Sequence, residues 1–515
     1  MEASAGSAYI FAALGAYVAV IVGLGVYYAR RADTTEDFIL AGHSLTTPYV
    51  CGSVVATWLG GAVVLGGATE AYSGGFQAIV WDPWSPVLTL LFCGFFMVAM
   101  FRRSRFTTAI DFYNARFDRR IGMCGLTIHV LAYTSWISAQ LLSLGVVIAV
   151  VTGLDPVPSS LIGAGIILLI SLTGGLWALS RSDMLAFIIL TVVLLLVLPY
   201  ALSAVGGLGA FIEKAGTRDG SPPFSLFYTT APNADGDPTG FSGYLGVLGF
   251  LYMLAAWFSV AVGDLGGSVL TARALAAKNE RAATRGFVFG GFIYLVLGMI
   301  PVIVGMCAYI LNPAVPDAGL DSVFPDFVQQ YLPPWVSVLF FVAVASAIIS
   351  TAGDTVLTTG ALLGHTAHRA LRPDATDRQC LLATRCAMVL CTGVGLLFGL
   401  AMGNLYKLLV FAGAIAFPSI GPTFICGIVW KGANVKGALA SIATGSGSWI
   451  VLVWLLIPYT DGEIWDAIYI GSVPAFVLSF AAIVGVSLAT RESCPPTPAR
   501  DVDGNDISDT RLLSW

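Results

Sequence analysis

The strongest constraint on this chain is its series of long apolar segments joined by mostly short connections. A helix needs about 20 mostly apolar residues to cross the hydrocarbon core, and only helices and closed barrels satisfy all their backbone groups there. The alternating apolar pattern of a membrane barrel is not found. We therefore predict an all-α integral membrane protein with about thirteen spanning helices, over residues 8–29, 46–72, 77–101, 121–152, 158–180, 183–206, 242–269, 285–312, 333–364, 380–402, 405–430, 436–458 and 464–489.

Composition supports this prediction and excludes several classes of protein. Hydrophobic residues make up 57% of the chain and charged residues 11%, whereas an ordinary soluble domain is roughly 25% charged. A soluble globular protein, a disordered chain and a coiled coil are thereby excluded. The net charge of −5 leaves no basic footprint for nucleic acid. The expected partners are a lipid bilayer and a small solute, while the oligomeric state stays open.

The distribution of lysine and arginine predicts the orientation in the membrane, because positively charged loops are retained on the cytoplasmic side. With the N-terminus outside, every lysine and arginine falls on the inner side except Lys214, Arg218 and Lys407. Arg116 and Arg273 are counted among the inner cations. The first apolar segment lacks the features of a cleaved signal peptide and is kept as a helix. We expect a multi-pass plasma-membrane protein whose C-terminus is cytoplasmic.

Two of the predicted spans are interrupted by glycine. The second carries Gly60, Gly61, Gly66 and Gly67, and the seventh carries a glycine cluster around Asp264. Glycines in one span are equally typical of close helix packing. Two such spans, each opening a set of five, instead indicate two inverted repeats with broken first helices, over residues 46–206 and 242–430. Secondary transporters have this architecture, because unwound backbone at mid-membrane exposes groups for ions and solutes. A channel would show a filter loop or polar rings, which we do not find.

The remaining segments complete the predicted organisation. Residues 1–45 form an N-terminal span and an inner loop, and residues 431–489 form two peripheral spans. The outer connections at 207–241 and 313–332 are long enough to be lids or to form short surface helices. Residues 490–515 are polar and acidic and are expected to be a disordered cytoplasmic tail.

Four motifs, in order along the chain, resemble those of the sodium/solute symporters, which include proline, pantothenate, sugar and choline carriers. EDFILAGHSL is followed by VVATWLGG at the second span, and GGLWALSRSD closes the fifth. ARALAAKNERAA follows the seventh span, and AIISTAGDTVL lies in the ninth. The resemblance implies ten core helices in two inverted repeats of five, the amino-acid/sodium symporter-like fold. It also implies solute import coupled to sodium, without another cofactor.

The resemblance implies a sodium site between the second and ninth spans. Its ligands would be the backbone carbonyls of Ala56, Leu59 and Ala347 with the hydroxyls of Ser350 and Thr351. About five uncharged oxygens suit a hard cation. Spacing alone favours hydroxyls that bond back to the preceding helical turn, whereas the surrounding motif favours the ion site.

Two carboxylates are compared with the family motifs: one is displaced by one position and the other matches. The acid that follows the serine and threonine is displaced by one position to Asp354, so that its side chain could face differently. Asp183 matches an aspartate on the inner sodium route. Capping of a helix N-terminus is an equal alternative for Asp183.

For the solute, we expect the two helix breaks and nearby aromatic residues to form the binding site. The candidates are Trp58, Gly60, Gly61, Trp136, Asp264 and Gly267. Gly267 stands where choline carriers have a tryptophan, so a full aromatic cage is not expected. A small zwitterion or organic acid is therefore favoured over a quaternary amine. Trp81 and Trp84 read as interfacial residues, and Glu70 as a cap or gate at the outer mouth.

Three other functions compete with the sodium-coupled importer. A proton-coupled carrier of the same fold would use Asp183, Asp264 or Asp354. A transporter-like sensor would need a separate output partner, because the tail is too short for a signalling domain. A membrane-bound enzyme would need clustered catalytic or metal-binding side chains, and the sequence shows none. The sequence therefore indicates a transporter and not an enzyme.

Overall fold

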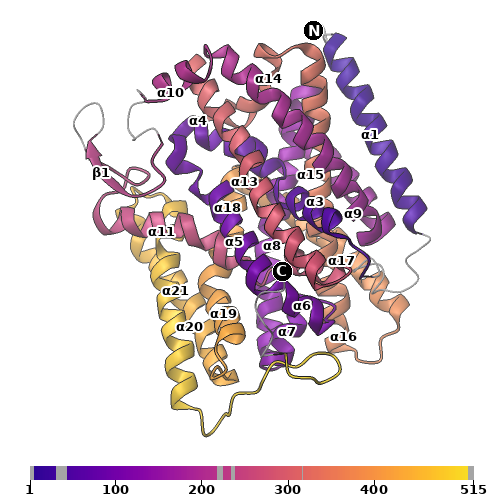
Figure 1. Ribbon diagram of the computed structural model, residues 1–515, viewed down its shortest axis with the longest axis vertical. Coiled ribbons are helices and arrows are strands. Elements are labelled where there is room, and N and C mark those ends of the chain that lie inside the picture. Colours follow the sequence, from indigo (N-terminus) through magenta and orange to yellow (C-terminus); the bar gives the residue numbers. More distant parts are fainter. Residues whose placement is uncertain (1–4, 30–42, 217–223, 233–237, 316, 508–515) are drawn as a thin grey trace.

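The computed structural model describes residues 5–29, 43–216, 224–232, 238–315 and 317–507. Within these ranges the chain is almost entirely helical (Figure 1). The first motif lies largely at residues 36–42 and so falls outside the described residues, as do Arg30 and Arg31.

The N-terminal half contains the helices of the first predicted repeat, preceded by α1. Its elements are α1 (Ala5–Ala29), α3 (Thr47–Trp58), η2 (Ala62–Gly66), α4 (Gly67–Ala78), η3 (Val80–Trp84), α5 (Ser85–Phe96), α6 (Val98–Ser104), α7 (Ala109–Arg116), α8 (Arg119–Thr152) and α9 (Pro156–Ala204). A kink at Gly175, with φ of 55°, divides α9 shortly before the boundary that the sequence predicts between the spans at 158–180 and 183–206.

The C-terminal half follows a long connection whose described residues contain a short helix and two paired strands. The connection holds α10 (Leu208–Gly216), β1 (Thr229–Pro232) and β2 (Pro238–Gly240), and the two strands pair antiparallel. The sequence predicted short helices here but not the hairpin. The remaining elements are α11 (Gly246–Gly263), α12 (Ser268–Ala276), α13 (Glu280–Leu311), η4 (Asp317–Ser322), α14 (Val323–Tyr331), α15 (Pro334–Ala361), η5 (Leu362–Ala367), α16 (His368–Leu371), α17 (Asp377–Met402), α18 (Leu405–Ser419), α19 (Gly421–Val429), α20 (Val435–Leu456), η6 (Ile457–Tyr459) and α21 (Ile464–Ala489).

Among the described residues, eight helices are long and apolar enough to cross a membrane alone, and three bent helix pairs raise this number to eleven. The bent pairs are α3 with η2–α4, η3–α5 with α6, and α18 with α19. Two shorter apolar helices, Tyr9–Gly23 and Pro156–Leu172, lie where the first and fifth spans are predicted. The chain is therefore a multi-span helical membrane protein, and the total of thirteen spans stays a prediction.

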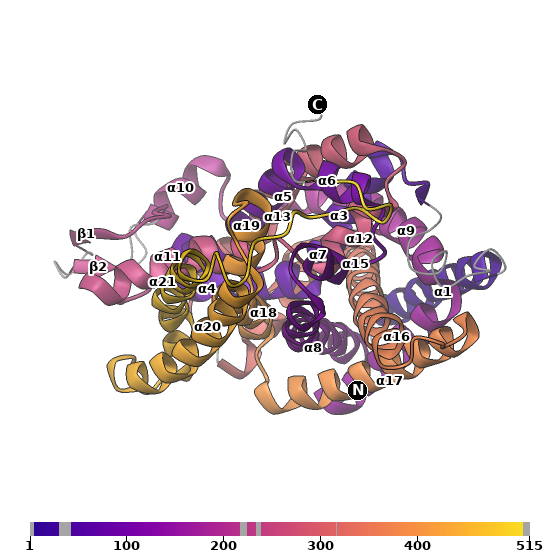
Figure 2. The same ribbon diagram turned by 90° about the horizontal axis from the view of Figure 1, so that it is seen from below.

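The arrangement in space places α8 and α15 inside the bundle and three helices at its edges. Figures 1 and 2 show α20 and α21 at one edge and α1 at the opposite edge. The spanning window of α15 is 83% buried, whereas that of α20 is 17% buried. Large apolar side chains such as Leu195, Leu397 and Trp454 are exposed on outer helices. Such side chains avoid water only when lipid covers them.

The described part of the C-terminal tail is ordered, so the prediction of a disordered tail is wrong for residues 490–507. The carbonyl of Thr497 accepts a hydrogen bond from the Arg116 guanidinium at 2.8 Å, and Ile507 is buried. Arg116 also donates to the carbonyls of Gly427, Trp430 and Ala433. These four carbonyls provide hydrogen-bond acceptors for the buried guanidinium of Arg116, which the sequence counts among the inner cations.

Candidate functional site

The break in the second span places a glycine against two other helices. α3 ends at Trp58, Leu59 leaves helical geometry with ψ of 56°, and the axis bends by 56° before α4. The amide of Gly61 donates to Gln140 Oε1 on α8 at 2.9 Å. A Cβ on Gly60 would lie 2.7 Å from both Gln140 Oε1 and Thr351 Oγ1. Only glycine therefore allows α3 to approach α8 and α15 this closely.

The same break meets α15 through a hydroxyl that the sequence singled out. Thr351 Oγ1 donates to the carbonyl of Ala56 at 2.9 Å, across 295 residues of sequence. Ala347 lies one helical turn before Thr351 and is buried, as is Leu59 at the end of α3. Thr355, in contrast, bonds back to the carbonyl of Thr351 within α15. Thr351 is thus directed at the helix break, whereas its neighbour one turn later makes an ordinary helical bond.

Ser350 has a different partner from Thr351. Its hydroxyl donates to Asp183 Oδ1 on α9, and Ser53 on α3 donates to the other oxygen of the same carboxylate. Asp183 is fully buried in the second half of α9, beyond the kink at Gly175. In the described part of the chain its hydrogen-bond donors are therefore hydroxyl groups of α3 and α15, and not the backbone amides that a capping side chain bonds.

Asp183 belongs to a buried charge cluster that joins the two predicted repeats. Arg273 on α12 forms ion pairs with Asp354 on α15 and, at 3.6 Å, with Asp183. Thr57 on α3 donates to Asp354 Oδ2 at 2.8 Å. All three charged side chains are inaccessible to solvent. Arg273, which the sequence places among the inner cations, is thus buried in the bundle beside two carboxylates, because the break before α12 carries it there.

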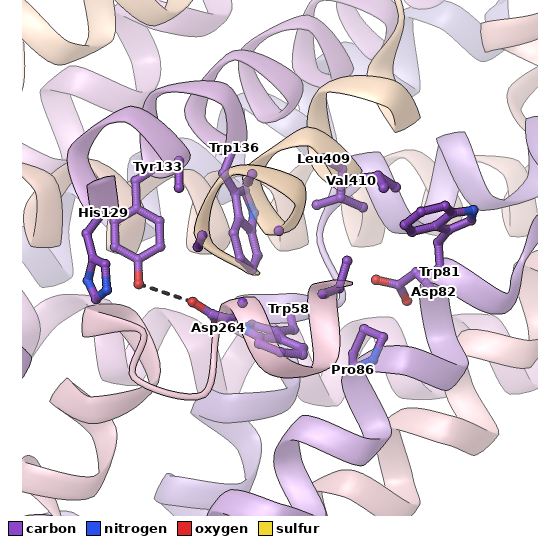
Figure 3. Close-up of a pocket in the computed structure, with 16 residues that line it drawn as sticks. Trp58, Trp81, Asp82, Pro86, His129, Tyr133, Trp136, Asp264, Leu409 and Val410 are labelled. Carbon is purple, nitrogen blue, oxygen red and sulfur yellow. Dashed lines mark hydrogen bonds between the residues drawn. The ribbon is translucent and has the colours of Figure 1, made fainter. Parts of the chain in front are cut away.

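A cavity lies between α3, η3, α5, α8, α11 and α18. Trp58, Trp136 and Asp264 line it, together with Trp81, Asp82 and Tyr133 (Figure 3). The ring centroids of Trp58 and Trp136 are 5.9 Å apart. Trp81 is only 3% exposed. The interfacial interpretation of Trp81 is therefore wrong, since η3 turns the indole inward against Tyr469.

Asp264 is placed by the break between α11 and α12. Its Oδ1 accepts a hydrogen bond from the Tyr133 hydroxyl at 3.3 Å, as drawn in Figure 3. Its Oδ2 is buried without a hydrogen-bond partner among the described residues. Tyr133 also accepts from the amide of Val269, so that one hydroxyl connects α8 to both sides of the break. The carboxylate is fixed in position but retains an unused acceptor.

Three glycines proposed for the solute lie outside the lining of this cavity. Gly60 and Gly61 face side chains of α8 and α15, and Gly267 lies against the side chain of Asp264. Glu70 is half-buried in the first turn of α4. The structure thus brings Trp58, Trp136 and Asp264 together and separates them from the glycines that shape the breaks.

Sequence reasoning missed several residues of the cavity and its surroundings, but a signal for them exists. His129, Tyr133, Trp136 and Gln140 recur at intervals of three or four residues along α8. This spacing places them on one face of the helix. Their polar and aromatic character on an otherwise apolar span marks that face as the one lining the centre of the bundle. His129 is hydrogen-bonded to Ser268 at 3.1 Å, as expected for a lone histidine within the bundle.

The sequence was compared with models of known protein families. The model of the sodium:solute symporter family matches residues 38–445, which contain both helix breaks, the charge cluster and the cavity. The chain belongs to the sodium:solute symporter family. Its function is accordingly sodium-coupled import of a solute, with sodium as the coupling ion. The relatives described below are transporters and not enzymes.

Relatives of this symporter carry different solutes. It is 24% identical to the high-affinity choline transporter 1 of Caenorhabditis elegans, over 83% of this chain and 75% of the relative. It is also 24% identical to the sodium/glucose cotransporter of Vibrio parahaemolyticus, over 89% and 88%. A sodium-coupled sialic acid symporter in a substrate-bound, outward-open state shares the fold, with a TM-score of 0.74 and 17% identity over 92% and 98%.

Proposed function

We propose that sodium binds where α3 breaks against α15. The ligands would be the carbonyls of Ala56, Leu59 and Ala347 with the hydroxyls of Ser350 and Thr351. The hydrogen bond from Thr351 to Ala56 carries this proposal, because it brings one proposed hydroxyl to one proposed carbonyl across the two repeats. A cation there would be bound by lone pairs of both oxygens, and the Thr351 hydroxyl would keep its proton and turn it away from the Ala56 carbonyl. Ser350 would then link the ion to Asp183, in keeping with an inner sodium route.

The solute would occupy the cavity lined by Trp58, Trp136 and Asp264, next to the same break. Alternating access would move the repeats at 46–206 and 242–430 around it, within a bundle of thirteen spans. Sodium is favoured over protons as the driving ion, because Asp183 and Asp354 are both ion-paired with the fixed cation Arg273. A carboxylate paired with a fixed cation is a poor proton carrier.

The experiment that tests this function is thermal stabilisation of the purified protein across a panel of small solutes, with sodium or with potassium. We expect at least one solute to stabilise the protein only when sodium is present, because both sites share the α3 break. Uptake of that solute into proteoliposomes should follow a sodium gradient. Uptake driven equally well by a proton gradient without sodium would contradict the proposal.

Replacing Trp136 with alanine should weaken solute binding and leave sodium binding intact. Trp136 presents its ring to the cavity beside Trp58 and provides no oxygen for the proposed ion site. Loss of one aromatic face from a buried site should cost roughly 1–2 kcal/mol, or about 5- to 30-fold in affinity. Solute and sodium titrations of the purified variant would measure both effects. Unchanged solute affinity in a variant that still binds sodium would remove Trp136 from the site.

The proposed orientation, with an outer N-terminus and a cytoplasmic C-terminus in the plasma membrane, predicts a labelling pattern. Asn114 on α7 and Thr230 in the outer hairpin are both exposed. In a variant whose accessible cysteines have been replaced, Asn114→Cys should react with a membrane-impermeant thiol reagent only from the cytoplasmic side. Thr230→Cys should react only from outside. Labelling of both positions from one face would contradict the thirteen-span topology.

A further inference from the structure

Acidic side chains outnumber basic ones in the described lining of the cavity, where His129 is the one basic residue. Two carboxylates, Asp82 and Asp264, line it, and no lysine or arginine is among its described lining residues. Both are at least nine-tenths buried. In Figure 3 they lie on opposite sides of the labelled group, with Trp58 and Pro86 between them. An occupant with a net negative charge would therefore be repelled from either side.

The unused acceptor of Asp264 requires a hydrogen-bond donor. A buried carboxylate oxygen without a partner is costly, and Oδ2 of Asp264 has none among the described residues. Because Asp264 lines the cavity, the occupant is well placed to supply the missing donor. A quaternary ammonium has no N–H to donate, whereas a protonated primary or secondary amine has at least two.

Backbone donors that might hold a solute carboxylate are already engaged within the protein. At the first break, the amide of Gly60 bonds to Trp58 and that of Gly61 to Gln140. At the second, the amide of Gly267 bonds to the carbonyl of Asp264, and that of Val269 bonds to Tyr133. These four amides are therefore not available to bind the carboxylate of an organic acid.

We infer that the transported solute is a small protonated amine. Its ammonium group would donate N–H bonds to Asp264 and pack on the rings of Trp58 and Trp136. This inference rests on the proposed placement of the solute in the cavity. Aromatic faces beside a carboxylate suit an ammonium group, because both attract positive charge. The earlier preference for an organic acid or a zwitterion is thereby replaced.

The second carboxylate refines the class of amine. Asp82 already accepts a hydrogen bond from Tyr294 through Oδ1 at 2.7 Å, on the side of the cavity opposite Asp264. A solute that carries a further donor at its far end, such as a hydroxyl or a second ammonium, can bond to both carboxylates. Amino alcohols and diamines are therefore expected to bind more tightly than simple alkyl amines of equal length.

The test is a binding titration of the full-length protein in lipid nanodiscs with saturating sodium. Binding is measured by tryptophan fluorescence or by calorimetry. The panel contains primary amines, amino alcohols and diamines of two to six carbons, with choline, glycine, glycolate and glucose as comparators. We expect saturable binding of at least one N–H amine, and binding of choline and glycolate at least tenfold weaker. If an acid, a zwitterion, a sugar or a quaternary amine binds more tightly than every N–H amine, the inference is wrong.

A charge-removing variant separates this inference from the proposed function. Asp264→Asn keeps the shape of the side chain and should lower amine affinity about 10- to 100-fold, while sodium binding measured without solute stays unchanged. Asp321→Asn is the matched control, because Asp321 is a half-buried carboxylate in η4 outside the cavity lining, and it should leave amine affinity unchanged. Full amine affinity in the Asp264 variant would overturn the inference, whereas loss of the sodium requirement in the parent protein would overturn the proposed function.

Discussion

Replacing Thr351 with alanine should weaken activation by sodium about 30-fold. Its hydroxyl is the one side-chain group of the proposed ion site that already meets a proposed carbonyl, that of Ala56. Loss of one of five oxygen ligands should cost roughly 2 kcal/mol, and each 1.4 kcal/mol is a factor of ten. The measurement is the sodium concentration that gives half-maximal solute uptake in proteoliposomes. Ser350→Ala should also weaken activation, because it removes a ligand and the bond to Asp183.

Thr355→Ala is the matched control for this experiment. Thr355 is a buried threonine one turn further along α15, and its hydroxyl bonds back to the carbonyl of Thr351. The same atoms are removed, but from a side chain that does not face the break. Sodium activation should stay within about twofold of the parent protein. Equal losses in the two variants would assign the effect to packing of α15 and would contradict the ion site.

Replacing Arg273 with methionine should destabilise the protein by roughly 3–5 kcal/mol, since removal of one partner leaves buried charges uncompensated. Arg273 is the ion-pair partner of both Asp183 and Asp354. Without it, two carboxylates would share a dry site with only hydroxyl donors from Ser53, Thr57 and Ser350. Thermal unfolding of the purified protein would measure the loss, and transport should fall with it.

Two comparisons make the Arg273 prediction specific. Arg103 pairs with Glu280 on the surface, where both side chains are partly exposed, and such pairs are worth about 0–1 kcal/mol. Arg103→Met should therefore change stability very little. The double variant Arg273→Met with Asp354→Asn should recover part of the loss, because one uncompensated charge has been removed. A single Arg273 variant as stable as the parent protein would show that the cluster does not need its cation.

Much of the fold could be predicted from local properties of the sequence. The apolar segments coincide with the helices because their length and hydropathy are set by the thickness of the bilayer and not by their neighbours. The breaks near Gly60 and Asp264 were predicted because clustered glycines weaken a helix wherever they occur. The hairpin at 229–240 and the ordered tail were not predicted. Their stability comes from contacts with distant segments, as between Thr497 and Arg116.

The candidate site was predicted only in part. Trp58 and Asp264 were placed together because they lie in the predicted breaks, and Trp136 was added because it resembles in position a substrate-binding aromatic of choline carriers. The cavity is lined by all three. Trp81 was misjudged, since a tryptophan at the start of a span is usually interfacial. Its inward orientation depends on the path of η3 between neighbouring helices. Tyr133 and Gln140 were overlooked although their spacing with Trp136 places all three on one face of α8.

The sequence by itself determined that this chain is a multi-span helical symporter with two broken helices, because span length, glycine clusters and family motifs are all local patterns. Only the tertiary structure decided which charges meet. The sequence around Arg273 does not distinguish it from an arginine in a loop. Its pairing with Asp183 and Asp354 depends on helices that are far apart in the sequence. Ser350 and its acceptor Asp183 are likewise 167 residues apart. Such partners are selected by the packing of the bundle, which brings buried charges together because each is too costly to leave alone.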